Sequence, residues 1–196
     1  YSPKTPFFTA PNATFVNHQI QPSEGIKKQD EVDAVFVGTN HPPNVEAVKK
    51  MISVAKQLID MPINFRLIGT VCEAVSQQSV PGNVELLGYV ENLDGELKQA
   101  DIALNPVTTG SGSNVKLSEY LSYGLPVLTT PFGARGSPAE DGKHIIIASS
   151  NDFDGELQRI TNGRYNLAEI SRNAIHLSQT RLNWKHVSQS LFDEIR

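Results

Sequence analysis

The sequence predicts an α/β protein built on a parallel sheet that helices cover on both faces. Six short apolar runs occur along the 196 residues, and each is followed by a turn or by a helical pattern. The runs are apolar rather than alternating, as expected for strands that are buried on both sides. Right-handed crossovers between such strands give a doubly wound, Rossmann-like sheet of about six strands in three layers, α/β/α.

The expected strands are AVFV (34–37), FRLI (65–68), VELL (84–87), IALNPV (102–107), PVLTT (126–130) and HIIIA (144–148). Apolar residues at spacings of three and four predict a helix over 45–59. Further helical patterns cover 72–78, 93–100, 115–123 and most of the chain from 154 onward. Four prolines interrupt residues 1–31. We therefore expect a leading irregular segment over 1–31 and one Rossmann-like domain over 32–196.

Composition excludes several classes of function. The net charge is −4 and no run gathers five or six like charges, so a nucleic-acid partner is not expected. No apolar run approaches the ~20 residues of a membrane span. Cys72 is the single cysteine, which rules out an internal disulfide and fits a reducing compartment. The five histidines show no metal-ligand spacing, and only His41 falls at the carboxyl end of an expected strand.

The stretch TTGSGSNVKLSE (108–119) places a glycine-rich loop between a strand and a helix. Ligands of such sheets bind beyond the carboxyl ends of the strands. The loop can present several backbone N–H groups, and the helix dipole adds about half a positive charge. Both features favour a phosphate or a diphosphate. The alternative is an ordinary turn in which Ser113 or Asn114 caps the helix. Neither the Walker motif nor the dinucleotide fingerprint is matched.

Lys116 and Glu119 are three residues apart and so share one face of the expected helix. Taken alone, this spacing favours a solvent-exposed ion pair of small energy. The alternative gives them separate roles. Lys116 would neutralise phosphate oxygens, and Glu119 would accept hydrogen bonds from the two hydroxyls of a ribose.

The stretch GSGSNVKLSEYLSYGLPVLTTPFGARG (110–136) resembles the signature of the GT-B glycosyltransferases, in particular the retaining group 1, family 4-like enzymes that use nucleotide-diphosphate sugars. The resemblance extends through VFVG, FRLIG, VELLGYV and ADIALNP to the terminal RLNWKHVSQSLFDEI, and covers roughly residues 11–196. Each piece is weak alone, and their combination is fairly specific.

This resemblance implies the C-terminal, donor-binding half of a two-domain hexosyltransferase-type enzyme. Such an enzyme transfers a glycosyl group from a UDP- or GDP-type sugar nucleotide to a hydroxyl, without a metal or cofactor. The acceptor, a glycan, a lipid-linked sugar or another hydroxyl compound, would bind the missing N-terminal half. The isolated chain is therefore expected to be inactive. A role in polysaccharide biosynthesis and a cytoplasmic location are expected, with any membrane association residing in the missing half.

The resemblance also implies roles for individual residues. Lys116 and Glu119 would be the catalytic side chains, Glu119 holding the ribose. The diphosphate would lie against Lys116 and the loop residues Gly110, Ser111, Gly112, Ser113 and Asn114. The main chain at Tyr89 and Val90 would contact the edge of the base. Gly38, Thr39 and Asn40 would face the phosphates.

Three departures from the family pattern leave alternatives open. Ser111 stands where many members have a first glutamate, and Thr39 stands where they have an arginine. A family lysine is replaced near Val45, and Arg135 is a candidate substitute for the lost cations. These losses motivate a second hypothesis, a non-catalytic nucleotide-binding or protein-interaction module. A sugar-nucleotide epimerase ranks third, because this half supplies no evident set of acids and histidines around a sugar.

Overall fold

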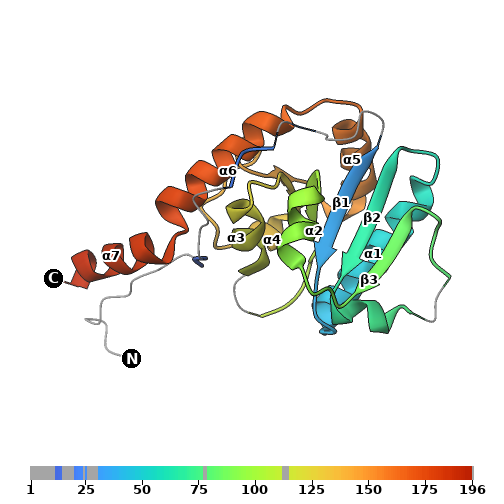
Figure 1. Cartoon of the computed structure of the whole chain (residues 1–196), viewed down its shortest axis with the longest axis horizontal. Helices are drawn as coiled ribbons and strands as arrows, with labels where there is room; N and C mark the ends of the chain where they lie inside the picture. The colour runs from blue at the N-terminus through green and yellow to red at the C-terminus, as the bar shows by residue number, and fades with distance from the viewer. Residues whose placement is uncertain are drawn as a thin grey trace.

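The computed structural model describes residues 12–14, 20–23, 25, 31–76, 79–111 and 115–195. Within these residues, six parallel strands form one sheet in the order β3-β2-β1-β4-β5-β6 (Figure 1). The strands are β1 (Val32–Val37), β2 (Ile63–Ile68), β3 (Val84–Gly88), β4 (Ile102–Asn105), β5 (Val127–Thr129) and β6 (Ile146–Ile147). The strand order reverses between β1 and β4, so the topological switch point lies at the centre of the sheet.

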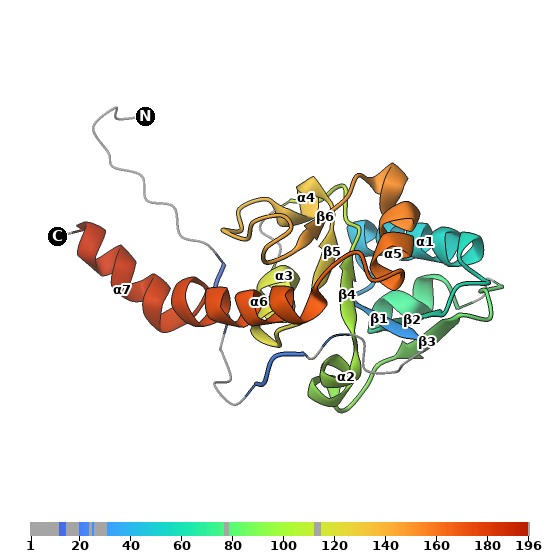
Figure 2. The same cartoon turned by 90° about the horizontal axis from the view of Figure 1, so that it is seen from above.

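Helices cover the sheet in two layers, which confirms the predicted α/β/α fold (Figure 2). The helices are α1 (Pro42–Gln57), α2 (Leu93–Gln99), α3 (Val115–Ser122), α4 (Pro131–Ala134), α5 (Phe153–Thr161), α6 (Leu167–Arg181) and α7 (Trp184–Ile195). Two short 3₁₀ turns, η1 (Thr70–Ala74) and η2 (Ser150–Asp152), complete the described elements. Helices α1 and α5 pack on one face of the sheet, and α2, α3 and α6 pack on the other.

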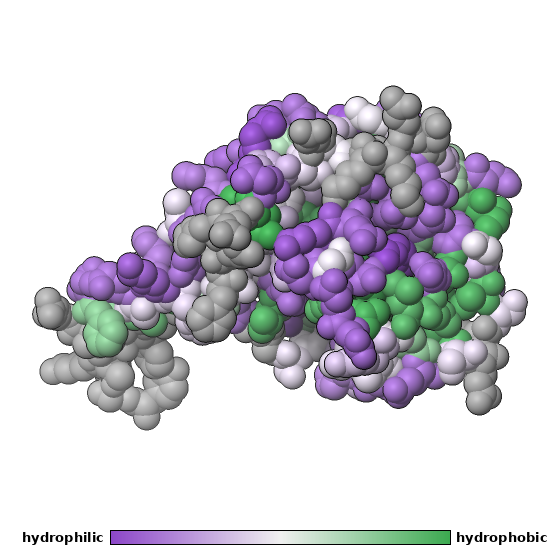
Figure 3. Space-filling view, in the orientation of Figure 1, coloured by the Kyte–Doolittle hydropathy of each residue, from purple (hydrophilic) through white to green (hydrophobic). Residues whose placement is uncertain are grey.

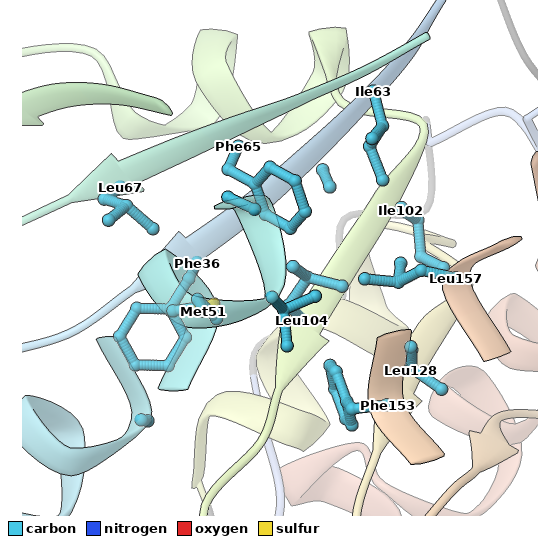
Figure 4. Packing of buried hydrophobic residues seen from close by; sticks show 14 of the residues in the cluster. Phe36, Met51, Ile63, Phe65, Leu67, Ile102, Leu104, Leu128, Phe153 and Leu157 are labelled. Atoms are coloured by element: carbon cyan, nitrogen blue, oxygen red, sulfur yellow. The ribbon is translucent and has the colours of Figure 1, made fainter. Parts of the chain in front are cut away.

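The central strands are apolar on both faces because each face has its own core. On β1, Phe36 points toward α1 and packs with Met51 and Phe65 in one buried cluster (Figure 4). Its neighbour Val35 belongs to the second cluster, together with Leu121 of α3. The strand therefore carries no polar alternation, as the sequence predicted.

The β2–β3 edge departs from this pattern, and the expectation of cover on both faces is wrong there. Asn64 and Arg66 alternate with the buried residues of β2 and lie on the face opposite α1. Arg66 forms an ion pair with Glu96 of α2, and its Nε lies 3.8 Å from Glu85. Helix α2 has only seven residues and leaves an open polar hollow of about 750 Å³ beside these strands. Figure 3 shows apolar surface gathering near this edge.

Two segments differ from the sequence prediction in element type. Where a helix was expected over 72–78, the described residues 72–76 contain only the end of the 3₁₀ turn η1. Conversely, α4 was not expected, because four residues that include a proline and a glycine give no helical periodicity. The Thr130 hydroxyl accepts a hydrogen bond from the N–H of Gly133 at 2.9 Å and so caps this turn.

The described pieces of the leading segment lie against α3 and α6. Thr14 donates its N–H to the carbonyl of Leu182 at 2.8 Å, and the Ser118 hydroxyl of α3 donates to the carbonyl of Asn12 at 3.2 Å. The chain ends in α7, which extends away from the body of the molecule (Figure 1). In the part of the chain described, no helix has the length and apolar character needed to cross a bilayer.

Candidate functional site

A cavity of about 130 Å³ lies at the switch point, beyond the carboxyl ends of β1 and β4. Three elements supply its walls: the start of α1, the loop after β4 with the first turn of α3, and the segment that follows α4. The lining residues are His41, Pro43, Asn44, Val107, Thr109, Gly110, Ser111, Lys116 and Arg135. This is the position at which open α/β sheets bind their ligands.

Helix α3 is fixed by its apolar side, which leaves the opposite side to face outward. Leu117, Tyr120 and Leu121 are buried in the second core, as the sequence predicted. The Tyr120 hydroxyl also accepts a hydrogen bond from the N–H of Val37 at 2.8 Å. This bond joins α3 directly to the end of β1. Since residues three apart share a helix face, Lys116 and Glu119 lie on the same side of α3, and both are half-buried.

Lys116 is held by neutral groups. Its Nζ donates a hydrogen bond to Oδ1 of Asn44 at 2.9 Å and lies 4.0 Å from the centroid of the Phe36 ring. Asn44 in turn donates to the carbonyl of Thr39 at 3.1 Å, so its amide is fixed at both ends. Burial lowers the pKa of Lys116 to about 7, and the nearby Glu119 carboxylate offsets only part of that effect. An anion entering the cavity would therefore stabilise the charged lysine.

Glu119 is half-buried and lies one turn further along α3, outside the lining of the cavity. Burial raises the pKa of its carboxyl group, and Lys116 works in the opposite direction. The two side chains interact electrostatically but form no ion pair in the described structure, because Lys116 bonds to Asn44 instead. The exposed ion pair that the spacing favours is thus not formed.

Arg135 also lines the cavity and lies directly after α4. Its guanidinium stacks over the Phe132 ring at 3.6 Å, and Nη1 donates to the Phe132 carbonyl at 2.7 Å. Nη2 approaches the carbonyl of Gly110 at 3.4 Å, which connects this wall to the glycine-rich loop. Two cationic side chains, from different elements, therefore line the cavity.

Two glycines at the strand ends are required by geometry. Gly69 has φ +101°, and a Cβ there would lie 2.2 Å from the Gly38 carbonyl oxygen, so the ends of β1 and β2 pack backbone to backbone. Gly110 has φ +125°, and a Cβ there would lie 3.2 Å from Cγ of Pro43. Gly110 therefore lets the loop after β4 pass close to the start of α1.

The structure brings together part of the site predicted from sequence. Lys116, Gly110 and Ser111 all line the cavity at the switch point. Thr39 and Asn40 are exposed residues after β1 that do not line it. The predicted positions Gly112, Ser113 and Asn114 lie outside the described residues.

The remaining predicted residues do not line this cavity. Gly38 is buried between Phe36 and Asn44, and Tyr89 is 82% exposed just after β3, followed by the half-buried Val90. Near Tyr123, at the end of α3, burial and the Asp94 carboxylate of α2 raise the pKa of the phenol to about 12. The Tyr123 phenol and the Asp94 carboxylate thus form a polar contact between the end of α3 and α2.

Sequence reasoning missed Asn44, which holds Lys116 from α1. The available signal was weak: a polar residue follows two prolines at the start of a helix, beside the carboxyl end of β1. Sequence reasoning did single out His41 and Arg135, and both line the cavity. Among the described residues, no group of three or more His, Cys, Asp or Glu side chains is arranged to hold a metal ion.

Comparison with known protein families identifies the class to which this fold and site correspond. The chain belongs to the family Glycosyl transferases group 1, whose model matches residues 31–162. That range contains the whole sheet and every described residue of the cavity. No curated protein matches the chain significantly.

Solved glycosyltransferases share the fold of the chain. Anabaena HepE, determined in complex with UDP and glucose, superposes with a TM-score of 0.68 at 14% identity, over 85% of this chain and 48% of that one. A glycosyltransferase from Rickettsia africae gives 0.71 at 9% identity, again over 85% and 48%. WaaG, a glycosyltransferase involved in lipopolysaccharide biosynthesis, gives 0.68 at 16% identity, over 92% and 54%. The chain thus spans about half the length of these proteins and has the fold of one half of the GT-B architecture.

Proposed function

We propose that this chain is the donor-binding half of a glycosyltransferase that takes a glycosyl group from a nucleotide-diphosphate sugar and transfers it to an acceptor hydroxyl. The reaction proceeds with retention and without a metal or cofactor. The acceptor, a glycan, a lipid-linked sugar or another hydroxyl compound, binds mainly to a second domain. The family membership and the cavity at the switch point support this proposal.

The observation that carries the proposal is the state of Lys116. A lysine with a pKa near 7 is costly to keep charged, and its direct partners are an amide oxygen and an aromatic ring. Such a cation at the mouth of a cavity is suited to an anionic ligand. The position at the carboxyl ends of the strands suits the phosphates of a nucleotide.

The same groups account for catalysis. When the glycosyl bond breaks, negative charge develops on the oxygens of the departing diphosphate. Lys116 and backbone N–H groups of the loop after β4 stabilise that charge in place, and such fixed groups need no reorganisation during the reaction. The departing diphosphate then accepts the proton of the acceptor hydroxyl, whose oxygen bonds to the sugar on the face that the diphosphate leaves, which gives retention. No side-chain nucleophile is required.

Glu119 binds the ribose of the donor. It lies one turn beyond Lys116 on the same helix face, so a nucleotide whose diphosphate meets Lys116 can place its ribose at Glu119. The main chain at Tyr89 and Val90 then contacts the edge of the base. A carboxylate accepts two hydrogen bonds from vicinal hydroxyls, each stronger than a bond between neutral groups.

Calorimetric titration of the full-length protein with UDP and GDP tests the proposal. We expect one of the two to bind. Lys116→Ala should weaken the diphosphate roughly 10-fold or more and leave the nucleoside unaffected. Glu119→Ala should abolish the preference for the ribonucleotide over its 2′-deoxy analogue. Lys49→Ala removes an exposed lysine of α1 and serves as the matched control. Failure of both nucleotides to bind would reject the function.

The replacement of the family arginine by Thr39 favours one further candidate, a non-catalytic module that binds a nucleotide or a protein. The two functions differ in one measurable respect. Transfer of sugar from any donor by the full-length protein would exclude the non-catalytic module. Nucleotide binding without transfer, over a panel of donors and acceptors, would favour it.

A further inference from the structure

We propose that Asn44 is a positioning residue, whose amide holds the ammonium group of Lys116 at the cavity without neutralising its charge. This inference rests on the proposed function, in which Lys116 meets the diphosphate. Asn44 acts through Lys116 from another element, because it lies in the first turn of α1 and Lys116 lies in the first turn of α3. Both side chains line the cavity at the switch point.

The direction of the Asn44 amide follows from its two partners. Its Nδ2 donates to the carbonyl of Thr39 at 3.1 Å, and a carbonyl oxygen can only accept. The charged Nζ of Lys116, which lies 2.9 Å from Oδ1 of Asn44, can only donate. An asparagine therefore satisfies both partners. An aspartate of the same size accepts only when it is ionised, so it would satisfy Lys116 and not the Thr39 carbonyl.

The backbone that carries Asn44 is also fixed. Pro42 and Pro43 begin α1, and the N–H of Asn44 donates to the carbonyl of His41 at 2.9 Å. The N–H of His41 donates to the carbonyl of Thr39 at 2.7 Å. These bonds close the turn between β1 and α1. The amide therefore meets Lys116 from a defined position.

Gly38, at the end of β1, leaves room for both groups that support Lys116. A Cβ at this position would lie 2.8 Å from Cε1 of Phe36 and 3.2 Å from Cγ of Asn44. The Phe36 ring and the Asn44 amide are the two groups in contact with Nζ of Lys116, with the ring centroid at 4.0 Å. The support of the lysine is thus built into the end of the strand.

Both of these supports are uncharged. The titratable groups around Lys116 are Glu119 on its own helix, together with His41 and Arg135, which line the same cavity. The Glu119 carboxylate offsets only part of the effect of burial on the pKa of Lys116. A carboxylate at position 44 would pair with the ammonium group and compete with an anionic ligand for it. An amide orients the group and leaves its charge to the ligand.

The test measures the pKa of Lys116 directly in the ligand-free, full-length protein, by NMR of ¹³C-labelled lysine. Lys116→Met identifies the signal. Asn44→Asp should raise the pKa from about 7 by roughly 1 to 3 pH units, because it places a carboxylate beside the ammonium group. Asn44→Leu should lower it, because burial remains and the acceptor is lost. Asn166→Asp adds the same charge at the N-cap of α6 and should leave the pKa unchanged.

The opposite signs separate positioning of the charge from a merely structural role. If Asn44 only stabilised the fold, both variants would loosen the contact, expose Lys116 to water and raise its pKa toward 10.5. Melting temperatures identify any loss of fold. If Asn44→Leu melts early, Asn44→Met takes its place with the same expected result, because its flexible side chain fills irregular gaps.

Titration with a nucleoside diphosphate, using whichever base binds, connects the pKa to the site. Asn44→Asp should weaken the diphosphate roughly 10-fold or more at pH 7 and should show little change between pH 7 and 9. In Asn44→Leu the loss of affinity with rising pH should begin at a lower pH than in the wild type. The nucleoside should be unaffected in both variants.

The two measurements distinguish failure of this inference from failure of the proposed function. A pKa that moves in the same direction in both variants, or in neither, overturns the role of Asn44, while nucleotide binding to the wild type leaves the proposed function standing. Absence of nucleotide binding to the wild type rejects the proposed function and, with it, the role of Asn44 in binding the diphosphate.

Discussion

Lys116 combines a costly environment with the position at which a ligand charge is expected. Burial works against its ammonium group, and an amide oxygen and an aromatic ring stabilise that group only in part. A residue selected for stability alone would not be a lysine here. Burial destabilises the charged form of Lys116 in the free protein. A bound anion stabilises that charged form, so the lysine contributes to the free energy of binding. Two measurable consequences follow at the scale of this residue.

The first consequence is a pH dependence of nucleotide binding. In the free protein the pKa of Lys116 is about 7, and a bound diphosphate raises it because the phosphate favours the charged form. Above pH 7, binding must therefore take up a proton, and diphosphate affinity should fall by up to about 10-fold for each pH unit. Calorimetry between pH 7 and 9 in buffers of different ionisation enthalpy measures both effects. Lys116→Arg stays charged, so its affinity should be flat over this range.

The second consequence concerns stability. In the unfolded chain Lys116 titrates near its ordinary value of 10.5, whereas in the folded protein it titrates near 7. The unfolded state binds more protons between these values, so this residue makes the protein more stable as pH rises from 7 to 10.5. Lys116→Met removes the penalty. Its advantage in free energy of unfolding should be largest below pH 7 and should vanish near pH 10.5.

Urea unfolding of both proteins at pH 6 and pH 9 measures the difference in stability, and the comparison cancels the other titrating groups. A Lys116→Met variant that is less stable than the wild type at pH 6 would contradict this account. It would show that the bond to Asn44 and the contact with Phe36 outweigh the cost of burial.

At the scale of elements, the site depends on how α3 is attached to β1. The Tyr120 ring is fully buried, and its hydroxyl accepts the N–H of Val37 at 2.8 Å. Tyr120→Phe keeps the ring and leaves that N–H without its partner. We expect the free energy of unfolding to fall by about 1–3 kcal/mol, measured by urea denaturation. Tyr89→Phe removes an exposed hydroxyl and should stay within about 0.5 kcal/mol of the wild type.

The elements with strong local patterns were predictable from sequence. Helix α3 was expected over 115–123 and spans Val115–Ser122, because its apolar spacing matches a core that covers one side. The strands of the centre were also predicted, with β1 longer and β4 shorter than expected. Local patterns failed for α4, whose four residues depend on a cap at Thr130. They also failed at the β2–β3 edge, where the length of α2 decides which side chains are covered.

The candidate site was predictable only along one segment of the chain. Gly110, Ser111 and Lys116 are near in sequence, so a motif could place them together. The partner of Lys116 lies 72 positions away on α1, and its identity follows from how α1 and α3 meet at the end of β1. The position of Arg135 likewise depends on the packing of α4 against the sheet. Contacts of this kind are set by tertiary structure and leave no period in the sequence.

At the scale of the whole molecule, this chain corresponds to about half of the solved glycosyltransferases that share its fold. The chain covers 48% of HepE and 54% of WaaG, and it carries the groups proposed to bind phosphate and ribose. We therefore expect this chain to be sufficient for binding of the nucleotide but not for transfer of the sugar. The first needs the cavity, whereas the second also needs an acceptor held in line and water kept away from the reacting carbon.

The last prediction compares this chain with the full-length protein. The chain alone should bind the nucleoside diphosphate within about 10-fold of the full-length protein, because the proposed phosphate contacts all lie within it. Sugar transfer from a radiolabelled donor should be detectable for the full-length protein and absent for the chain. Lys116→Ala should weaken binding of the diphosphate roughly 10-fold or more in both. Transfer at comparable rates by the chain alone would show that acceptor binding and exclusion of water are properties of this half.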